Sequence, residues 1–304
     1  MATTARKKIN VESAEAVLGL HWFVARGEGL FAEEGLEVEI FLPGVRATKF
    51  SMDDPRAHDH HLIRSTNYQF LFEEKKVDIV RACEWGQIRR AYDSQRGCPI
   101  VGKRPAVVCQ GIYVLPDSTV NAPVQLAGKT VGVQFHQGSH YSTLMMLEGF
   151  LTRDEMRVVH AGTVRERYEA LMKGEVDAAT LLEPWMTLAE KNGCKKLVET
   201  HYLGVENISS DIEPETFEAL MRAIRKAVRL INADKKKYVH YLIDEIPPEY
   251  AKQLTPDDFY LPRLRYVDPA PYTQEEFERA HMWMVGWDLV GQDASYEKLV
   301  TNLV

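Results

Sequence analysis

Apolar residues recur along the chain with two spacings, and each spacing predicts one kind of element. In residues 36–42 they alternate with glutamates, the pattern of a half-buried strand, and a proline–glycine pair ends the run. In residues 14–33 they recur every three or four positions, which predicts a helix that ends before Gly35. With a short strand over residues 8–13, the opening is strand–helix–strand, the unit from which parallel sheets are built.

The same alternation of elements restarts further along the chain. We expect strands over 77–82, 130–135, 156–160, 176–182 and 196–199, and helices over 85–94, 139–150, 164–173, 188–191 and 215–232. Residues 99–115 hold further short strands, residues 44–66 form a loop or an irregular helix, and the C-terminal part consists of helices separated by prolines. The pattern predicts an α/β protein with two lobes joined by short crossings.

Composition narrows the classes of partner. With 304 residues, of which 45% are hydrophobic, the chain can bury a core in each of two lobes. The net charge of −7 provides no general basic field, so we expect no nucleic-acid partner. The four cysteines lack CxxC spacing, which favours buried apolar side chains over a zinc site or a redox pair.

No stretch is apolar for long enough to predict a membrane span, which needs roughly 18 residues. The first ten residues are charged but lack the apolar centre of a signal peptide. We therefore expect a soluble protein, cytoplasmic as the sequence stands and periplasmic if a signal peptide has been removed.

Four motifs, in the right order, resemble one family. They are Ala25-Arg-Gly-Glu-Gly-Leu-Phe-Ala-Glu-Glu-Gly-Leu-Glu-Val-Glu-Ile40, Leu126-Ala-Gly-Lys-Thr-Val-Gly-Val133, Ala170-Leu-Met-Lys-Gly-Glu-Val-Asp-Ala178 and Glu183-Pro184-Trp185. They are similar to the periplasmic-type solute-binding proteins for sulfonate, taurine and nitrate, and to relatives that make the thiamine pyrimidine. The resemblance implies the type II binding-protein fold, with residues 1–112 plus 212–304 as one lobe, residues 113–211 as the other, and a ligand cleft at the hinge.

Two further segments are Lys49-Phe-Ser-Met-Asp-Asp-Pro55 and Pro99-Ile-Val-Gly-Lys-Arg-Pro-Ala-Val-Val-Cys-Gln-Gly-Ile-Tyr-Val114. Through them, residues 44–135 resemble an enzyme of this fold, the hydroxybiphenyl sulfinate desulfinase. The resemblance places its catalytic cysteine near Ala16, its active-site histidine on Lys49 and its sulfinate-holding arginine near Asp59, so these functional residues are not carried over. The cysteine-rich metal motif of the thiamine-pyrimidine synthases is also missing. If this chain is an enzyme, it works without the desulfinase cysteine.

The strongest candidates for ligand binding are at starts of helices. Ser139 and His140 would place a hydroxyl, an imidazole and free backbone N–H groups at a helix N-terminus, which suits an anion, and Gln137 precedes them. Ser13 closes the first strand in a similar way. An ordinary serine N-cap is the alternative for both serines.

Two acidic–aromatic pairs follow predicted strands, one in each lobe. Glu84 with Trp85, and Glu183 with Trp185, would face the cleft, where the indole rings could stack on a flat ligand. The alternative for Trp85 is a core tryptophan, with Glu84 as a helix-start acid.

The segment from Lys49 to His61 holds the remaining candidates for chemistry. Lys49 is a weak Schiff-base candidate, and His58 and His60 are weak candidates for proton transfer. Adjacent histidines rarely point at one ion, so we expect no metal, and no cofactor is indicated. A polar loop at the mouth of the cleft, with one histidine touching the ligand, is the alternative.

Two functions agree with these observations. The first is a small-molecule-binding protein of the ABC-transporter substrate-binding type, which holds an anionic or aromatic carboxylate, sulfonate or sulfinate and, if exported, delivers it to an importer permease. The alternative is a cytoplasmic, desulfinase-like lyase or hydrolase that acts on an aromatic acid. One fold can serve either ligand binding or catalysis, so the fold does not decide between the two functions. We expect ligand binding, with catalysis as the alternative.

Overall fold

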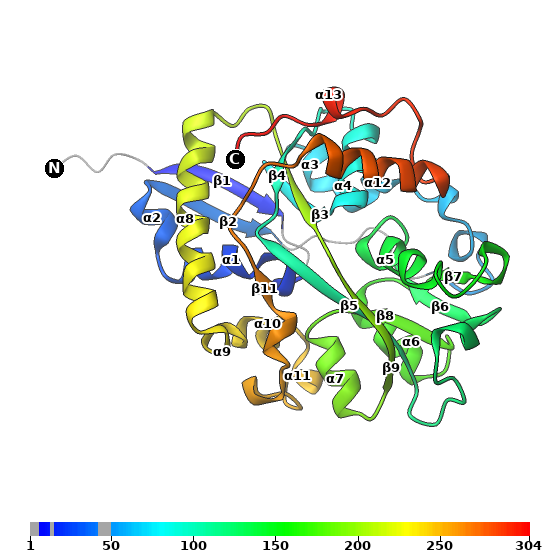
Figure 1. The fold of residues 1–304 in the computed structure, drawn as a ribbon. Helices are drawn as coiled ribbons and strands as arrows, with labels where there is room; N and C mark the ends of the chain where they lie inside the picture. The colour runs from blue at the N-terminus through cyan, green and yellow to red at the C-terminus, as the bar shows by residue number, and fades with distance from the viewer. Residues whose placement is uncertain (1–5, 13–14, 42–49) are drawn as a thin grey trace.

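The computed structural model describes residues 6–12, 15–41 and 50–304, without the side chain of Tyr68 (Figure 1). Two mixed sheets form the two halves of the molecule, and helices pack around both. Ser13 and Lys49, two of the predicted ligand-binding residues, lie outside the described residues.

The first sheet has the strand order β2-β1-β3-β10-β4. Its strands are β1 (Lys7–Glu12), β2 (Leu36–Phe41), β3 (Ile79–Cys83), β4 (Ile100–Lys103) and β10 (Gly204–Ile208). β1 pairs in parallel with both β2 and β3, whereas β10 runs antiparallel to β3 and β4. The parallel strands therefore end at one common edge, where polar groups can meet a ligand.

The second sheet has the order β11-β5-β8-β6-β7, and β9 also pairs with β5. Its strands are β5 (Ala106–Val114), β6 (Thr130–Val133), β7 (Arg157–His160), β8 (Ala178–Leu181), β9 (Lys195–Tyr202) and β11 (Arg265–Tyr266). β6 is parallel to β7 and β8, so this sheet also gathers the carboxyl ends of its parallel strands at one edge.

Thirteen α-helices and seven 3-10 helices are described. The α-helices are α1 (Ala16–Gly27), α2 (Leu30–Glu33), α3 (Phe70–Glu73), α4 (Glu84–Asp93), α5 (Gly138–Leu147), α6 (Val164–Met172), α7 (Trp185–Lys191), α8 (Pro214–Ala233), α9 (Lys235–Tyr238), α10 (His240–Asp244), α11 (Pro248–Ala251), α12 (Gln274–Gly286) and α13 (Tyr296–Leu299). The 3-10 helices are η1 (Pro55–Ala57), η2 (His60–Leu62), η3 (Ser65–Tyr68), η4 (Pro123–Leu126), η5 (Arg153–Glu155), η6 (Pro256–Asp258) and η7 (Leu261–Arg263).

The chain passes between the sheets at two short crossings. β4 ends at Lys103 and β5 begins at Ala106 in the other sheet, and β9 ends at Tyr202 two residues before β10 begins. These crossings agree with two lobes joined without a flexible tether. The division into residues 1–112 plus 212–304 and residues 113–211 stays a proposal.

The C-terminal third extends along both halves. α8 packs on α1 and α2 beside the first sheet, whereas Arg265 and Tyr266 of β11 extend the second sheet. In Figure 1 the yellow and orange helices α9–α11 descend toward α7, and the red-orange α12 crosses above α4 toward α5. This segment therefore contacts elements of both halves.

The helix predicted over residues 14–33 is divided in the structure. α1 ends at Gly27 and α2 begins at Leu30, because Gly29 adopts a left-handed conformation with φ of 74°. The periodicity of the apolar residues continues across this break, which explains the longer prediction. β10 was not predicted, and we expected helices where the short β11 forms.

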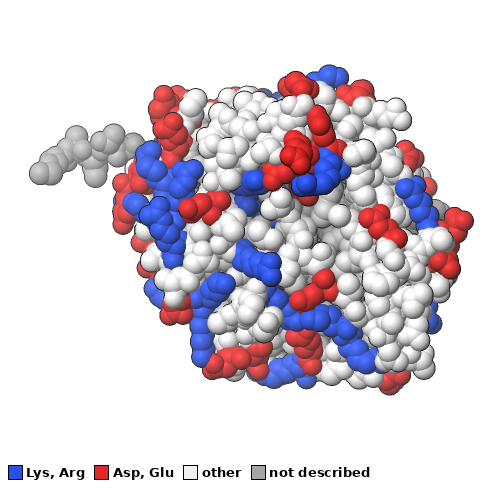
Figure 2. Space-filling model, viewed as in Figure 1, with Lys and Arg blue, Asp and Glu red and all other residues white. Residues whose placement is uncertain are grey.

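The described cysteines behave as predicted, since all four are free and buried. No described helix is long and apolar enough to cross a membrane. Lysines and arginines do not form a single basic field on the face in Figure 2, where blue and red side chains alternate. Near α8, for example, Lys226 pairs with both Glu33 and Glu34.

Candidate functional site

A cavity of about 330 Å³ lies between the two sheets. Its walls come from the carboxyl ends of β1, β3, β6 and β8, from the starts of α1, α4, α5 and α6, and from residues 245–247 of the C-terminal segment. Helix N-termini carry free N–H groups and a partial positive charge, so this arrangement favours an anion. Its volume is at the lower end of the range for small-molecule sites, roughly 300–1,000 Å³.

Arg81 is the side chain that most clearly lacks a partner in the cavity wall. It is 4% exposed, and none of its three guanidinium nitrogens has a hydrogen-bond partner. Its guanidinium carbon lies 4.8 Å from the ring centre of Trp22, so the cation rests on an indole face. Burial lowers the pKa of Arg81 to about 9, which still leaves the group charged at neutral pH.

Two acidic side chains attract Arg81, namely Glu206 on the neighbouring strand β10 and Glu12. Glu12, at the end of β1, is 7% exposed, and its Oε2 atom has no hydrogen-bond partner. Burial raises the pKa of Glu12 to about 7, against the attraction of Arg90 and Arg81. Arg90 itself is held, because it donates to Gln87 Oε1 at 2.8 Å and to the His136 carbonyl at 3.0 Å. Arg81 is therefore freer than Arg90 to bind a ligand.

The start of α5 forms the opposing wall. Ser139 Oγ accepts a hydrogen bond from Gln134 N at 2.9 Å, so the hydroxyl proton remains to be donated elsewhere. A Cβ atom on Gly138 would lie 2.6 Å from Tyr202 Oη, which means that glycine allows the helix start and Tyr202 to approach closely. The first N–H groups of α5 have no acceptor within the helix.

α6 presents a second helix start to the cavity. Its capping box joins Thr163 and Glu166, with Thr163 N donating to Glu166 Oε2 at 2.8 Å. Arg167, 2% exposed, donates from Nε to the Thr180 carbonyl and from Nη1 to the Gly162 carbonyl. These bonds fix its guanidinium in the cavity wall.

Three of the predicted ligand-binding residues line the cavity. Gln137 and Ser139 lie at the start of α5, and Trp185 lies at the start of α7. Trp185 packs against Tyr250 with ring centres 5.0 Å apart, and so one edge of its indole is supported by the C-terminal segment. Whether these residues bind a ligand stays a prediction.

Glu84 and Trp85 lie outside the cavity lining. Glu84 accepts a hydrogen bond from Tyr272 Oη at 3.0 Å, and burial raises its pKa to about 7. The Trp85 ring packs between Tyr202 and Trp283, at 5.4 and 6.0 Å. Strand β3 does end beside the cavity, but α4 directs these two side chains into contacts with the C-terminal segment.

Glu183 and His140 are also occupied elsewhere. Glu183 is 1% exposed, accepts from Thr187 Oγ1 at 2.7 Å and pairs with Arg263 at 3.2 Å. His140 is buried against Phe135, with ring centres 4.9 Å apart, and its Nδ1 accepts from His136 N. Burial lowers the pKa of His140 well below its usual value, so the imidazole is neutral.

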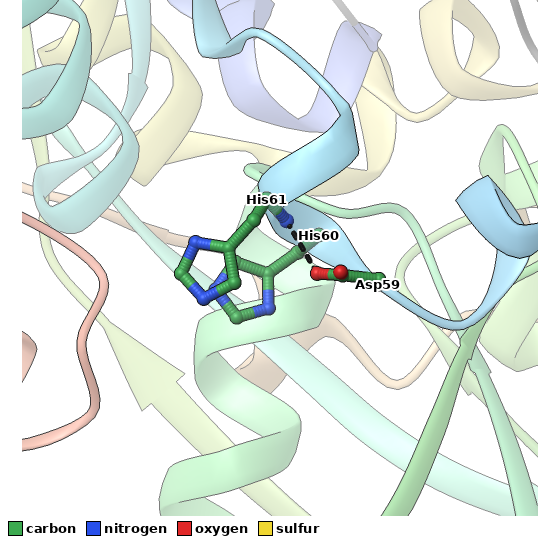
Figure 3. Close-up of side chains that lie close together, drawn as sticks. All are labelled: Asp59, His60 and His61. Atoms are coloured by element: carbon green, nitrogen blue, oxygen red, sulfur yellow. Dashed lines mark hydrogen bonds between the residues drawn. The ribbon is translucent and has the colours of Figure 1, made fainter.

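None of the three histidines His58, His60 and His61 lines the cavity. His58 Nε2 donates to the Met52 carbonyl at 2.7 Å. Figure 3 shows the rings of His60 and His61 overlapping in the view at a tilt, with Asp59 to one side bonded to the His61 backbone N–H. Candidate ligand atoms of these three residues lie within 4.8 Å of one another. The ring centres are 4.0 Å apart, however, and imidazole lone pairs lie in the ring plane, so overlapping rings do not aim at one ion. We propose no metal there.

Sequence reasoning missed the charged residues that define the cavity. Arg81 had a visible signal, since it interrupts the apolar run of residues 79–83 where a buried strand is predicted.

Cys83 lines the cavity too and accepts from Gly86 N, but burial raises the pKa of its thiol to about 11, which leaves it a poor nucleophile.

The family model described as NMT1/THI5 like matches residues 85–237, half of the chain. No curated protein sequence matches the chain. The family match includes the starts of α5 and α6 and the predicted Trp185 corner, whereas Arg81 lies before it.

Solved structures share the fold at low sequence identity. The alkanesulfonate-binding protein SsuA from Xanthomonas axonopodis pv. citri, bound to MOPS, has a TM-score of 0.70 at 15% identity and covers 99% of this chain and 100% of its own. The CA3427 gene product of Candida albicans, with the generic periplasmic binding protein fold, has a TM-score of 0.64 at 13% identity and coverages of 98% and 97%. The desulfurization enzyme DSZB has a TM-score of 0.63 at 15% identity and the same coverages.

These likenesses confirm the predicted fold class. The two mixed sheets form a periplasmic-binding-protein-like α/β fold, and both a binding protein and an enzyme are among its structural neighbours. By the match over half of its length, the chain belongs to the NMT1/THI5-like family.

Proposed function

We propose that this protein binds a small organic anion in the cavity between its sheets and serves as the substrate-binding component of an ABC-type importer. The observation that carries the proposal is Arg81, a buried guanidinium on the cavity wall with no hydrogen-bond partner. The fold shared with the alkanesulfonate-binding protein SsuA supports the same class of ligand.

An unpaired buried cation is costly, and a bound anion would remove that cost. Leaving a charged group without partners in a low-dielectric site costs several kcal/mol, whereas a charge-assisted hydrogen bond contributes roughly 1.5–3 kcal/mol. A carboxylate, sulfonate or sulfinate has the planar or forked oxygens that a guanidinium binds in pairs. The N-terminus of α5 lies on the opposing wall and would contact the same ligand across the cleft.

The rest of the lining limits the ligand's size and shape. A cavity of about 330 Å³ accommodates a compact molecule, and the aromatic residue Trp185 lies in its lining beside the polar groups. We therefore propose a carboxylate, sulfonate or sulfinate with a short chain or a single ring.

Isothermal titration calorimetry with series of carboxylates, sulfonates and sulfinates tests this function. For a ligand that binds the wild type, Arg81→Met should weaken affinity roughly 10- to 100-fold, because the charge-assisted bonds are lost. Arg222→Met is the matched control, since Arg222 is an exposed arginine that pairs with Glu34 on the far side of the first sheet. Equal affinities for wild type and Arg81→Met would refute the anion site.

The enzymatic alternative has weaker support. Of its candidates, Lys49 lies outside the described residues, and His58 and His60 do not line the cavity. Chromatography of the same ligand mixtures after several hours tests it directly. Product formed by the wild type and lost on His60→Ala would favour a desulfinase-like lyase or hydrolase instead.

The place of the protein in the cell follows from the proposed function. Delivery to an importer permease requires an exported protein, so we propose a periplasmic location. Cell fractionation of the native host tests this, and recovery of the protein with cytoplasmic markers alone would exclude the importer role while leaving ligand binding open.

A further inference from the structure

A pair of carboxyl groups lies in the cavity wall at the start of α1. Glu15 is the N-cap residue of that helix, and Glu245 reaches it from the C-terminal segment between α10 and α11. Glu245 Oε2 accepts a hydrogen bond from Ala16 N at 2.5 Å, across 229 positions of sequence. Both glutamates line the cavity.

This contact changes what the start of α1 can bind. A free helix N-terminus attracts an anionic ligand, but here an internal carboxyl already accepts from the first helical N–H. A ligand's own anionic group would meet Glu15 and Glu245 there and be repelled. The anionic group of the ligand is therefore expected to bind at Arg81, and the start of α1 favours a cationic group.

The charges around the pair leave it short of positive partners. Arg167 of α6 and Arg104, between the sheets, attract Glu15, yet neither forms an ion pair with it in the described part of the chain. Glu245 is influenced by the Ala16 N–H and by Glu15, a like charge. Burial raises the pKa of both carboxyls, and that of Glu245 lies well above its usual value.

The cavity thus has two unsatisfied poles. At one, the guanidinium of the buried Arg81 forms no hydrogen bond with the described residues, although Glu206 and Glu12 attract it. At the other, neither carboxyl group forms an ion pair with the described residues, although Arg167 and Arg104 attract Glu15. A ligand that carries only an anionic group would pair with Arg81 and leave Glu15 and Glu245 without a cationic partner.

We propose that the ligand is amphoteric, with an anionic group held by Arg81 and an ammonium or other cationic N–H donor held between Glu15 and Glu245. This inference rests on the proposed anion-binding function and narrows its ligand class. A bound cation favours the charged form of both carboxyls, so we expect binding to be accompanied by release of a proton to solvent.

Matched ligands that differ only by an amine test the inference. Calorimetry would compare aminopropanesulfonate with propanesulfonate, aminobutanoate with butanoate, and aminomethylbenzenesulfonate with methylbenzenesulfonate. We expect the amine-bearing member of at least one pair to bind about tenfold more tightly, as one charge-assisted contact provides. Repeating the titration in buffers of different ionisation enthalpy should reveal the release of a proton for that member alone.

Two variants locate the effect. Glu245→Gln keeps the acceptor for Ala16 N but removes the charge, and should abolish the preference for the amine while leaving affinity for the amine-free partner within about twofold. Glu15→Gln serves the same purpose if Glu245→Gln does not fold, and Glu218→Gln, an exposed position on α8, is the control.

The outcomes separate this inference from the proposed function. Equal binding within every pair, reduced in both members by Arg81→Met, would overturn the amphoteric ligand and retain the anion site. Preference for the amine that survives both Glu15→Gln and Glu245→Gln would also overturn it. If no member of any pair binds, the anion site itself is refuted and this inference with it.

Discussion

At the scale of single residues, burial of ionisable groups is what distinguishes this protein. Glu12 and Glu84 have pKa values raised to about 7 by burial, whereas Arg81 has one lowered to about 9. Arg81 and Glu12 line the cavity, so a bound ligand can offset the free-energy cost of burying them. Glu84 does not line it, and its carboxyl group accepts a hydrogen bond from Tyr272.

Glu84 therefore predicts a pH-dependent stability. Its pKa rises from 4.5 unfolded to about 7 folded, so the folded state is not penalised at or below pH 4.5 and loses stability as the pH rises toward 7. The full loss above that pH is roughly 3 kcal/mol. Relative to wild type, Glu84→Gln should gain stability between pH 5 and pH 8, as measured by urea denaturation. A difference between the two proteins that is independent of pH would show that Glu84 titrates normally.

At the scale of elements, helix starts build the site. α4, α5 and α6 each follow a strand or its adjoining loop, and all three begin at the cavity. α6 is the best capped of these, because Thr163 and Glu166 satisfy each other's backbone N–H groups. The same box recurs away from the cavity in α12, between Thr273 and Glu276.

These two boxes form a matched pair for mutation. Thr163→Ala and Thr273→Ala should each lower the free energy of unfolding by about 1 kcal/mol, since each removes one N-cap acceptor. Only Thr163→Ala should also weaken ligand binding, because Thr163 lines the cavity. Thermal denaturation and calorimetry measure the two effects. Equal affinity for both variants would indicate that the start of α6 takes no part in recognition.

At the scale of the whole molecule, the C-terminal segment bridges the two halves. Glu148, at the end of α5, accepts from the indole N–H groups of both Trp283 and Trp287 of α12. Arg153 lies over the Trp287 ring at 4.2 Å and donates to the Gly286 carbonyl. α12 also packs on α4 of the first half, so opening the cleft on this side breaks these contacts.

Glu148→Ala should therefore favour opening. We expect ligand dissociation to accelerate roughly threefold or more, since two hydrogen bonds that join α5 to α12, each worth about 0.5–1.5 kcal/mol, are lost. Stopped-flow tryptophan fluorescence measures the rate, with Glu278→Ala on the exposed face of α12 as control. An unchanged rate would mean that the cleft opens without separating α5 from α12.

The sequence predicted the positions of strands and helices more reliably than the contacts that their side chains form. Apolar periodicity located β1, β2 and most of the strand–helix alternation, because burial of one face imposes that spacing. It did not indicate β10, whose Glu206 and Asn207 are buried polar residues within a short strand. For the site, Gln137, Ser139 and Trp185 could be placed at strand ends and helix starts, where the fold gathers its ligand groups.

By itself, the sequence determined the strand–helix alternation of an α/β chain, since periodicity and turn residues are local properties, whereas the shared cleft was implied by the family resemblance. Only the tertiary structure decided which side chains enter that cleft. Glu84 and Glu183 follow strands as predicted, but contacts with Tyr272 and Arg263 direct them elsewhere. Glu245 reaches the start of α1 from 229 positions away, and packing leaves the Arg81 guanidinium without a hydrogen bond to the described residues. Both depend on contacts distant in sequence, which no local pattern records.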